Sequence, residues 1–444
     1  MRKKKIIISK NKGQILWNKA KKIIPGGNML ISKRPERFLP NRWPAYFKKT
    51  KGCYIWDLDS NKYVDLSLMG VGTNILGYSN NEVDSAVKNV VKDGNLSTLN
   101  CPEEVKLAEK LISIHPWAKM VKFTRSGGEA NALAIRIARA ATGKDKILVC
   151  GYHGWHDWYI ASNLENNKNL DQLLLPGIKT LGVPKKLKGT TLTFNYNDLA
   201  RVTKLLKSHK DIGAIKMEVE RNLKPKKNFL KQIRKLCNKY NILLIFDECT
   251  SGFRETNGGL HLKYKVNPDI AIFGKALGNG YAINAIIGTS KVMRYANKTF
   301  ISSTFWTERI GPTAALKTLE IMRREKTWKK IKKIGSSIKF RWLKLSEKHK
   351  IPIEIFGLDA LCGFNFKSKK NLHFKTFITQ EMLKNGFLAS NIIYVCIKHN
   401  EKILEKYFKI LDKIFLKIKI NFKGNKINNL LEEKISEKSF GRLN

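Results

Sequence analysis

The sequence has few cysteines, few acidic residues and no long apolar run, and each shortage excludes a class of protein. Seven cysteines are scattered through 444 residues without a CxxC pair, which is typical of reduced thiols and argues against a disulfide framework. No apolar run reaches the roughly 18 residues that a membrane-spanning helix needs. Only three isoleucines follow the basic opening MRKKK, too few for a signal peptide. We therefore expect a cytoplasmic protein with no membrane partner.

The shortage of acidic residues leaves a large positive charge. Asp and Glu number 36 against 84 Lys and Arg, and the formal net charge is +48. Such an excess can indicate a nucleic-acid partner. It can also come from an overuse of Lys, Ile and Asn along the whole chain, because the lysines are not gathered into one arm. We favour the second interpretation and expect no nucleic-acid partner.

Two short apolar runs carry the strongest functional signal. Residues 243–246 lead to Asp247, and residues 269–273 end just before Lys275; both runs have the length and composition of strands buried on two faces. Ligands of open α/β sheets bind at the carboxyl ends of such strands. A carboxylate and an amine there suit pyridoxal 5′-phosphate (PLP), because the amine can form a Schiff base and the carboxylate keeps the ring nitrogen protonated. Taken alone, the two runs are better explained as ordinary buried strands with a solvated Asp and Lys nearby.

Two further strand ends carry polar or aromatic groups. The sequence RSGGEA follows an expected strand at 121–124 and begins a helix with small residues at a 3.6-residue period, so its free N–H groups can bind phosphate. Ser126 is also an ordinary helix N-cap. The strand at 147–150 leads to GYHGWHD, in which Tyr152 can stack on a planar ring. A metal site formed by His153 and His156 is the alternative, but no third ligand is evident, and we expect no metal.

The segments FDECTSGFR and PDIAIFGKALGNGY resemble the lysine-bearing segment of class III (fold type I) PLP-dependent aminotransferases, in the branch that contains glutamate-1-semialdehyde 2,1-aminomutase. The resemblance extends from Ile24 to about Ile418, with several motifs in the family's order. It implies an α/β fold with a large domain on a mostly parallel, doubly wound sheet and a smaller α+β domain. We expect an N-terminal arm and a hairpin packing on the small domain (1–70), a large PLP-binding domain (71–325), a small domain (326–420) and a Lys- and Asn-rich tail (421–444).

The resemblance also assigns the site. Lys275 would hold PLP covalently, and Asp247 would pair with its ring nitrogen. The phosphate would lie on the turn formed by Ser126, Gly127 and Gly128, in which Gly128 replaces the family's usual hydroxyl residue and Arg125 replaces its Asn. The other cofactor-binding residues that it implies are Tyr152, His153, Glu218, Asn222, Cys249, Ser303 and Thr304. Because Thr304 matches a residue of the family's subunit-crossing loop, we expect a homodimer with shared active sites.

The implied reaction moves an amino group, through a Schiff base on Lys275, between a small amino donor and a carbonyl acceptor. Intramolecular transfer of the glutamate-1-semialdehyde 2,1-aminomutase type is the alternative. The chain departs from the aminomutase pattern at the substrate end, where Gly70-Val71 replaces a Ser-Trp pair, Lys33-Arg34 lies in a poorly matching stretch and Asn391 is nearest to an acidic position. These differences favour an aminotransferase. A third hypothesis is a nucleic-acid-binding protein on an inactive enzyme fold, against which the presence of Lys275 and Asp247 argues.

Overall fold

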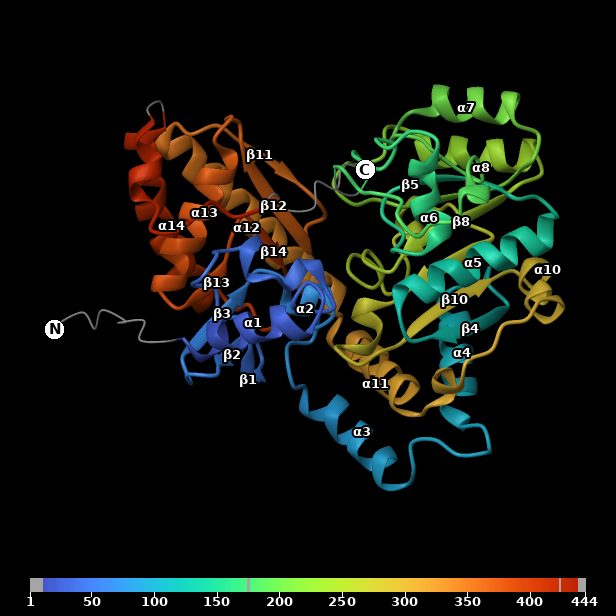
Figure 1. Ribbon diagram of the computed structural model, residues 1–444. Helices are drawn as coiled ribbons and strands as arrows, with labels where there is room; N and C mark the ends of the chain where they lie inside the picture. The colour runs from blue at the N-terminus through green and yellow to red at the C-terminus, as the bar shows by residue number, and fades with distance from the viewer. Residues whose placement is uncertain (1–10, 174–175, 423–424, 438–444) are drawn as a thin grey trace. The chain divides into compact units, whose positions relative to one another are not determined.

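The computed structural model describes residues 11–173, 176–422 and 425–437, which divide into two compact units (Figure 1). Of the described residues, one unit contains 11–80 and those from 330 to 437; the other contains those from 81 to 329. Both boundaries fall later than the expected ones at 70 and 325. The first does so because Tyr78 belongs with the N-terminal hairpin: its backbone bonds to Gly52 in both directions, and its hydroxyl donates to Asp65 at 2.6 Å.

The second unit is built on a seven-stranded sheet in the order β4-β10-β9-β8-β7-β5-β6. Only β10 is antiparallel to its neighbours; the other pairs are parallel. The strands are β4 (Met120–Thr124), β5 (Lys146–Cys150), β6 (Thr191–Thr193), β7 (Ile212–Glu218), β8 (Leu243–Glu248), β9 (Ile270–Phe273) and β10 (Asn284–Gly288). This arrangement confirms the predicted α/β fold with a mostly parallel sheet.

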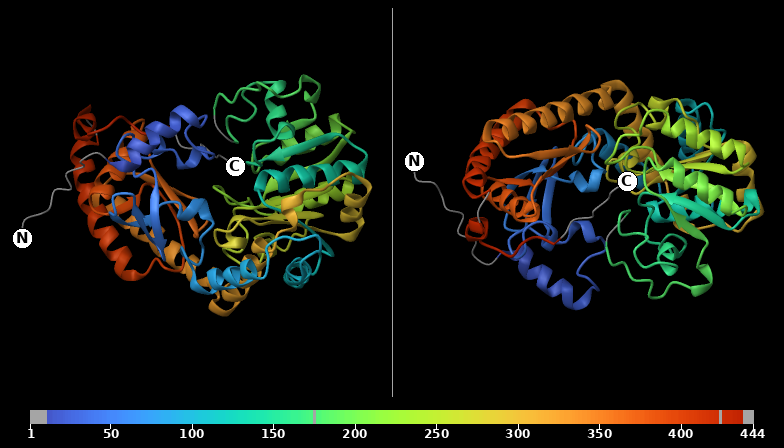
Figure 2. Two further views of the ribbon diagram at one scale, coloured as in Figure 1. Left: turned by 60° about the horizontal axis from the view of Figure 1, so that its bottom comes forward. Right: turned by 90° about the horizontal axis from the view of Figure 1, so that it is seen from above.

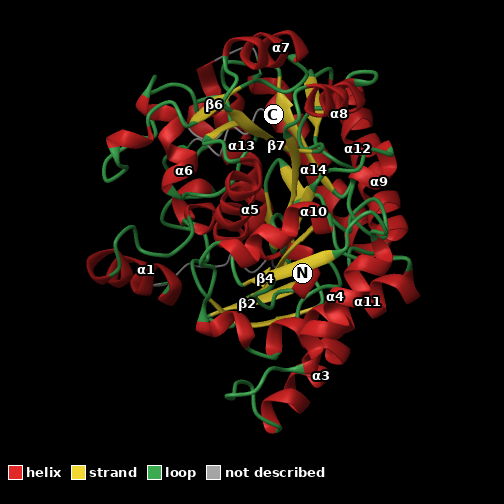
Figure 3. Cartoon of the chain, turned by 90° about the vertical axis from the view of Figure 1, so that its right-hand side faces the viewer, coloured by secondary structure: helices red, strands yellow, loops and turns green. Residues whose placement is uncertain are grey.

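Helices pack against this sheet (Figure 3). Helix α5 (Gly127–Thr142) lies against β4, β7, β8, β9 and β10, and its small residues Ala134 and Ala138 let it approach the strands closely. Helix α8 (Phe229–Lys239) contacts β8 and α7 (Leu199–Ser208). After Leu243, every residue of β8 is buried, so both of its faces are covered. The unit also contains α3 (Asn81–Lys92), α4 (Pro102–Ile114), α6 (Asp157–Ile160), α9 (His261–Tyr264), α10 (Ser290–Met293) and α11 (Ile310–Glu325).

The first unit contains two small sheets, ordered β1-β2-β3-β13 and β11-β12-β14. The hairpin of β2 (Tyr54–Asp57) and β3 (Lys62–Leu66) turns at Ser60, where the Asp57 carboxylate accepts the N–H groups of Asp59 and Asn61. Strand β3 pairs in parallel with β13 (Phe387–Ala389), so N-terminal and C-terminal segments share one sheet. The other strands are β1 (Phe47–Lys51), β11 (Ile353–Phe356), β12 (Leu361–Phe366) and β14 (Ile392–Tyr394).

The helices of this unit include two long ones, coloured orange and red in Figure 2. They are α12 (Thr327–His349), which begins just before the unit boundary, and α14 (Glu401–Asn421). The others are α1 (Lys12–Ile23), the short left-handed segment α2 (Met69–Gly72) and α13 (Asn371–Lys384). In the parts of the chain that the structure describes, no helix combines the length and the apolar character needed to cross a membrane.

The region predicted as a Lys- and Asn-rich tail is partly packed. Residues 423–424 and 438–444 lie outside the described residues, as do 1–10 of the N-terminal arm. Between them, η8 (Asn425–Leu430) and the following residues belong to the first unit. Ser436 is 1% exposed and its N–H donates to Thr376 Oγ1, while Arg42 pairs with Glu432 and Glu433. Within the predicted tail, these contacts hold residues of the 425–437 stretch in the first unit.

Candidate active site

Lys275 follows β9 at the carboxyl end of the sheet, and three elements fix its amine. The Nζ atom donates to Thr250 Oγ1 at 2.6 Å. The Lys275 backbone has φ of 40°, in the left-handed region that non-glycine residues rarely adopt. At Gly274, a Cβ would lie 1.9 Å from Asn284 Oδ1 on β10, so no side chain fits there. The turn after β9, the turn after β8 and β10 thus determine where the amine lies.

Asp247 lies near the end of β8, and groups on three sides hold its carboxylate. The Oδ2 atom lies 2.9 Å from His153 Nδ1 and 3.9 Å from Lys216 Nζ, and Oδ1 accepts the Cys249 N–H at 3.1 Å. Burial raises the pKa of the Asp247 carboxyl, but the Lys216 charge and the His153 hydrogen bond outweigh burial and hold that pKa well below its usual range. The group is therefore ionised at neutral pH, the state that pairs with a protonated ring nitrogen.

His153 connects Asp247 to the backbone of β5. Its side chain is fully buried, with Nδ1 on Asp247 and Nε2 3.1 Å from the Cys150 carbonyl oxygen. Burial and the charge of Lys216 lower the pKa of His153, whereas Asp247 raises it. Both ring nitrogens face oxygen acceptors, so His153 fixes the orientation of the carboxylate. Among the described residues, no group of three or more His, Cys, Asp or Glu side chains could hold a metal ion.

Glu218 and Tyr152 lie beside Asp247. Glu218 ends β7 and is the register partner of Asp247 on β8. Its Oε2 atom accepts the Tyr152 N–H at 3.3 Å. Gly151 makes this approach possible: its φ is 103°, and a Cβ there would lie 2.7 Å from Glu218 Oε2. The half-buried Tyr152 ring contacts the Tyr159 ring edge to face. The ends of β5, β7 and β8 thus bring the predicted Tyr152, Glu218 and Asp247 together.

The glycine turn begins helix α5. Ser126 Oγ accepts the Glu129 N–H, and the Glu129 carboxylate accepts the Ser126 N–H at 2.7 Å, which forms a capping box. The N–H groups of Gly127 and Gly128 belong to the first turn and have no partner inside the helix, so they can receive an anion. A Cβ on Gly128 would lie 2.9 Å from His156 Nε2. The His156 ring thus lies where a hydroxyl-bearing side chain at position 128 would begin.

Cys249 lies between this turn and Asp247. Its Sγ atom would be 3.7 Å from a Cβ on Gly127 and is 3.8 Å from Asn284 Oδ1. Burial raises the pKa of the Cys249 thiol, and the charge of Asp247 raises it further. The thiol therefore stays protonated and packs beside the carboxylate. The predicted Asn222 lies partly buried in the loop after β7.

Ser303 and Thr304 are the predicted site residues that lie apart from this cluster. Both are exposed. The Ser303 carbonyl, just before η7 (Thr304–Thr307), accepts the Trp306 N–H at 3.3 Å, and the Thr304 carbonyl accepts the Thr307 hydroxyl at 2.8 Å. Arg125 connects this segment to the glycine turn. Its guanidinium pairs with Glu308 at 2.6 Å and donates to the Trp306 carbonyl at 2.8 Å. The Arg that replaces the family's usual Asn therefore holds the segment next to the start of α5.

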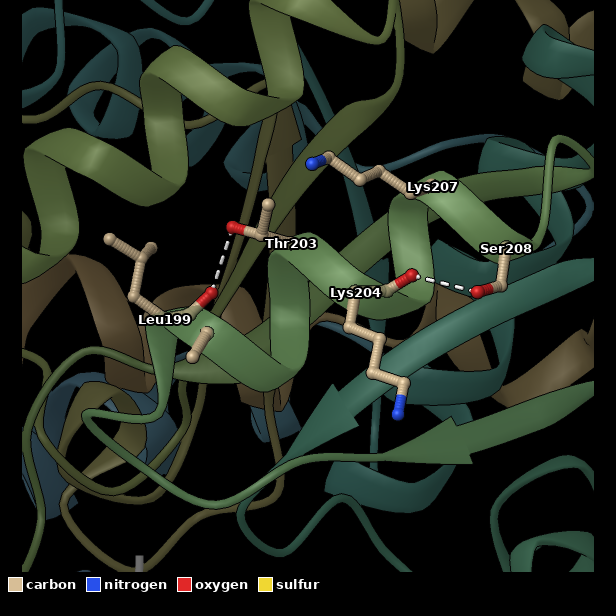
Figure 4. Close-up of a pocket in the computed structure, with 6 residues that line it drawn as sticks. Leu199, Thr203, Lys204, Lys207 and Ser208 are labelled. Carbon is tan, nitrogen blue, oxygen red and sulfur yellow. Dashed lines mark hydrogen bonds between the residues drawn. The ribbon is translucent and has the colours of Figure 1, made fainter.

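A surface depression on α7 is separate from these residues (Figure 4). It is lined by Leu199, Ala200, Thr203, Lys204, Lys207 and Ser208. The Thr203 and Ser208 hydroxyls donate to helix carbonyls at 2.9 and 3.1 Å, so they are occupied within α7. None of the lining residues is a predicted site residue. The depression is therefore not part of the predicted site.

The model of the aminotransferase class-III family matches residues 40–399. The chain belongs to this family. It is 34% identical over 404 residues to the 3-aminobutyryl-CoA aminotransferase of Cloacimonas acidaminovorans (strain Evry), covering 87% of this chain and 92% of that protein. It is 30% identical over 431 residues to the glutamate-1-semialdehyde 2,1-aminomutase of Methanocaldococcus jannaschii, covering 91% and 98%. The PLP internal aldimine form of the Sphingopyxis sp. MTA144 FumI protein has a similar fold, with a TM-score of 0.84 at 24% identity over 94% of this chain and 99% of that one.

Membership in the class-III aminotransferases confirms the expected PLP-dependent enzyme that acts on small molecules. The residues fit the cofactor: Lys275 would hold its aldehyde carbon, Asp247 its ring nitrogen, and the Ser126–Gly128 turn its phosphate. When bound, PLP supplies an electron sink for the substrate carbon. Thr250 and Lys216, which the sequence analysis did not single out, also belong to this site, because they contact Lys275 and Asp247 directly.

Proposed function

We propose that the protein moves an amino group from one small molecule to the carbonyl carbon of another, with Lys275 as the group that transfers protons. The observation that carries this proposal is the Lys275 amine, which donates to Thr250 in the turn that follows the ionised Asp247. Once released from the cofactor, the amine would remove a proton from the carbon that bears the substrate's amino group and return it on the other side of the C–N bond. The Thr250 hydroxyl orients the amine for both steps.

Transfer between two molecules is favoured over transfer within one. Asn391, near the acidic position of the aminomutase pattern, is 5% exposed and donates from Nδ2 to the Phe364 carbonyl at 2.8 Å, so its amide is used in the fold of the first unit. Gly70 and Val71 occupy left-handed backbone, with φ of 66° and 61°, in place of the Ser-Trp pair. The 3-aminobutyryl-CoA aminotransferase relative suggests substrates whose amino group is β to a carbonyl. The aminomutase relatives support the alternative.

A half-reaction separates the two outcomes. The purified PLP-bound protein is mixed with single amines (3-aminobutyryl-CoA, 3-aminobutyrate, L-glutamate and L-alanine) without a carbonyl acceptor. We expect one of them to release about one carbonyl product per site and to convert the cofactor to its amine form. Glutamate-1-semialdehyde is tested in parallel. Catalytic isomerisation of that compound, with no carbonyl product from any amine, would contradict the proposal and establish the aminomutase reaction.

We propose further that the enzyme is a cytoplasmic homodimer whose sites borrow Thr304 from the opposite chain. Large apolar side chains near this segment are exposed in the single chain, among them Phe300 (83%) and Phe305 (71%). Their exposure supports a partner surface there. Arg125 and Glu308 hold the segment in a fixed place, as a shared site requires. All seven cysteines are free thiols, which fits a reducing compartment.

Replacing Thr304 with alanine should weaken PLP binding. A hydrogen bond to a charged group contributes about 1.5–3 kcal/mol, so the dissociation constant should rise roughly tenfold to a hundredfold. Titration of the apoprotein with PLP measures this change, with Thr307→Ala in the same segment as the control. Mixing Thr304→Ala chains with Lys275→Ala chains should restore some activity, because one site of each heterodimer is then intact. An active monomer, or chains that exchange without recovery, would contradict the shared site.

A further inference from the structure

Lys216 is a charged residue inside a buried strand. It lies in β7, in which every residue is buried, and its side chain is 0% exposed. Its Nζ atom has no hydrogen-bond partner among the described residues. The Asp247 carboxylate is an opposite charge at 3.9 Å. A buried, unpaired ammonium is costly, so this ion pair is what makes a lysine tolerable there.

The sheet register places Lys216 one step below the site. Lys216 is the partner of Ile245 and Glu218 is the partner of Asp247, so all four side chains project from the same face of the sheet. Helix α5 covers this face, where Ala134 packs in one core cluster with Ile245. The buried side chains of α5 carry no charge. Water and mobile ions are therefore kept away from Lys216, and its charge is only weakly screened.

The titratable groups that face Lys216 come from three strands. Asp247 and Cys249 belong to β8 and the turn after it, Glu218 to β7, and His153 to the segment after β5. Burial lowers the pKa of Lys216, and the charges of Asp247 and Glu218 oppose this change. With PLP bound, the two carboxylates would face the ammonium and the protonated ring nitrogen.

We propose that Lys216 is a positioning residue that acts through Asp247. As a fixed buried cation, Lys216 keeps the Asp247 carboxylate ionised. It also offsets part of the negative potential by which Asp247 would favour protonation of bound PLP. This inference rests on the proposed function, because it assumes that Asp247 faces the cofactor ring. Asp247 then divides its negative charge among Lys216, His153 and the ring nitrogen. Lys216 thereby limits how strongly the site protonates the cofactor and sets the pH range in which the enzyme works.

The test is the pH titration of the visible absorbance of the PLP-bound protein. Lys216→Met and Lys216→Gln each remove the charge and keep a side chain of similar length, and neither should unfold the protein, because replacing a buried charge with a neutral group is often neutral for stability. With an effective dielectric constant of about 20 and a separation of several ångströms, we expect both variants to raise the titration midpoint by about one pH unit. Lys207→Met on the exposed face of α7 is the matched control and should leave the midpoint unchanged.

Lys216→Arg, which keeps the charge, should stay closer to wild type than the two neutral variants. Unchanged titration midpoints in both neutral variants would overturn the proposal, because the charge of Lys216 would then have no effect on protonation of the cofactor. Midpoint shifts of opposite sign in Lys216→Met and Lys216→Gln would also overturn the proposal, because altered packing rather than the lost charge would then be the cause. These outcomes are distinct from a failure of the proposed function, which would appear as an absence of PLP binding or amino transfer in the wild-type protein.

Discussion

Replacing Lys275 with alanine should abolish amino transfer and the visible absorbance of the lysine-bound cofactor. The variant loses the amine that would hold PLP covalently and the group that would move the proton, and proton transfer alone accounts for on the order of 10²–10⁴ in rate. We therefore expect a loss on the order of 10⁴ or more in kcat. Single-turnover assays at saturating PLP, together with absorbance spectra, measure the effect.

The control for Lys275→Ala is Lys207→Ala, an exposed lysine that lies on α7. It should keep both activity and absorbance. Lys275→Ala should remain folded, because the Lys275 side chain is only partly buried. A folded Lys275→Ala protein that still turns over at more than a few per cent of the wild-type rate would show that another residue carries the proton.

Replacing Asp247 with asparagine should reduce the rate of the chemical step on the order of 10²-fold or more, which corresponds to several kcal/mol. The side chain keeps its size, but the negative charge that holds the ring nitrogen protonated is lost. His153 and Lys216 would then face a neutral amide, so the cofactor's electron sink weakens. Lys216 also loses its counter-charge, so the melting temperature should fall and the rate is expressed per folded site. Pre-steady-state measurement of the half-reaction isolates this step from product release.

Asp269→Asn is the matched control for Asp247→Asn. Asp269 lies next to β9 in the same sheet, where it pairs with Arg234 at 2.7 Å and accepts the Leu244 N–H at 2.7 Å. Its contacts are structural, so this variant should lower the melting temperature and leave kcat per folded site near wild type. Near-normal turnover of Asp247→Asn would mean that the Asp247 carboxylate is structural too.

The sequence predicts the central part of the site because short apolar runs indicate where its strands end. The runs before Asp247 and Lys275 are fully apolar, and parallel strands bring their carboxyl ends to one edge, so the two residues had to lie on the same side of the sheet. The glycine turn before α5 was equally readable, since a helix with small residues at a 3.6-residue period follows it. The roles of the individual side chains came from the family resemblance.

Contacts between distant segments could not be predicted. The pairing of β3 with β13 joins residues more than three hundred positions apart, and no local pattern marks it. Helix α13 begins at Asn371, where the side-chain Oδ1 atom accepts the Phe366 N–H of β12 and the following Phe374 is buried. Lys216 is recognisable in the sequence as a lysine between apolar strand residues. Its ion pair was not predictable, because its partner Asp247 lies on another strand.

The most direct measurement of the central claim is reduction of the PLP-bound protein with borohydride, followed by digestion and peptide mapping. Borohydride fixes the cofactor on whichever lysine holds it. We predict a single modified peptide, with the pyridoxyl group on Lys275, and its loss in Lys275→Ala. A tag on Lys216 or on any other lysine in the wild-type protein would contradict the assignment of Lys275 as the residue that holds the cofactor.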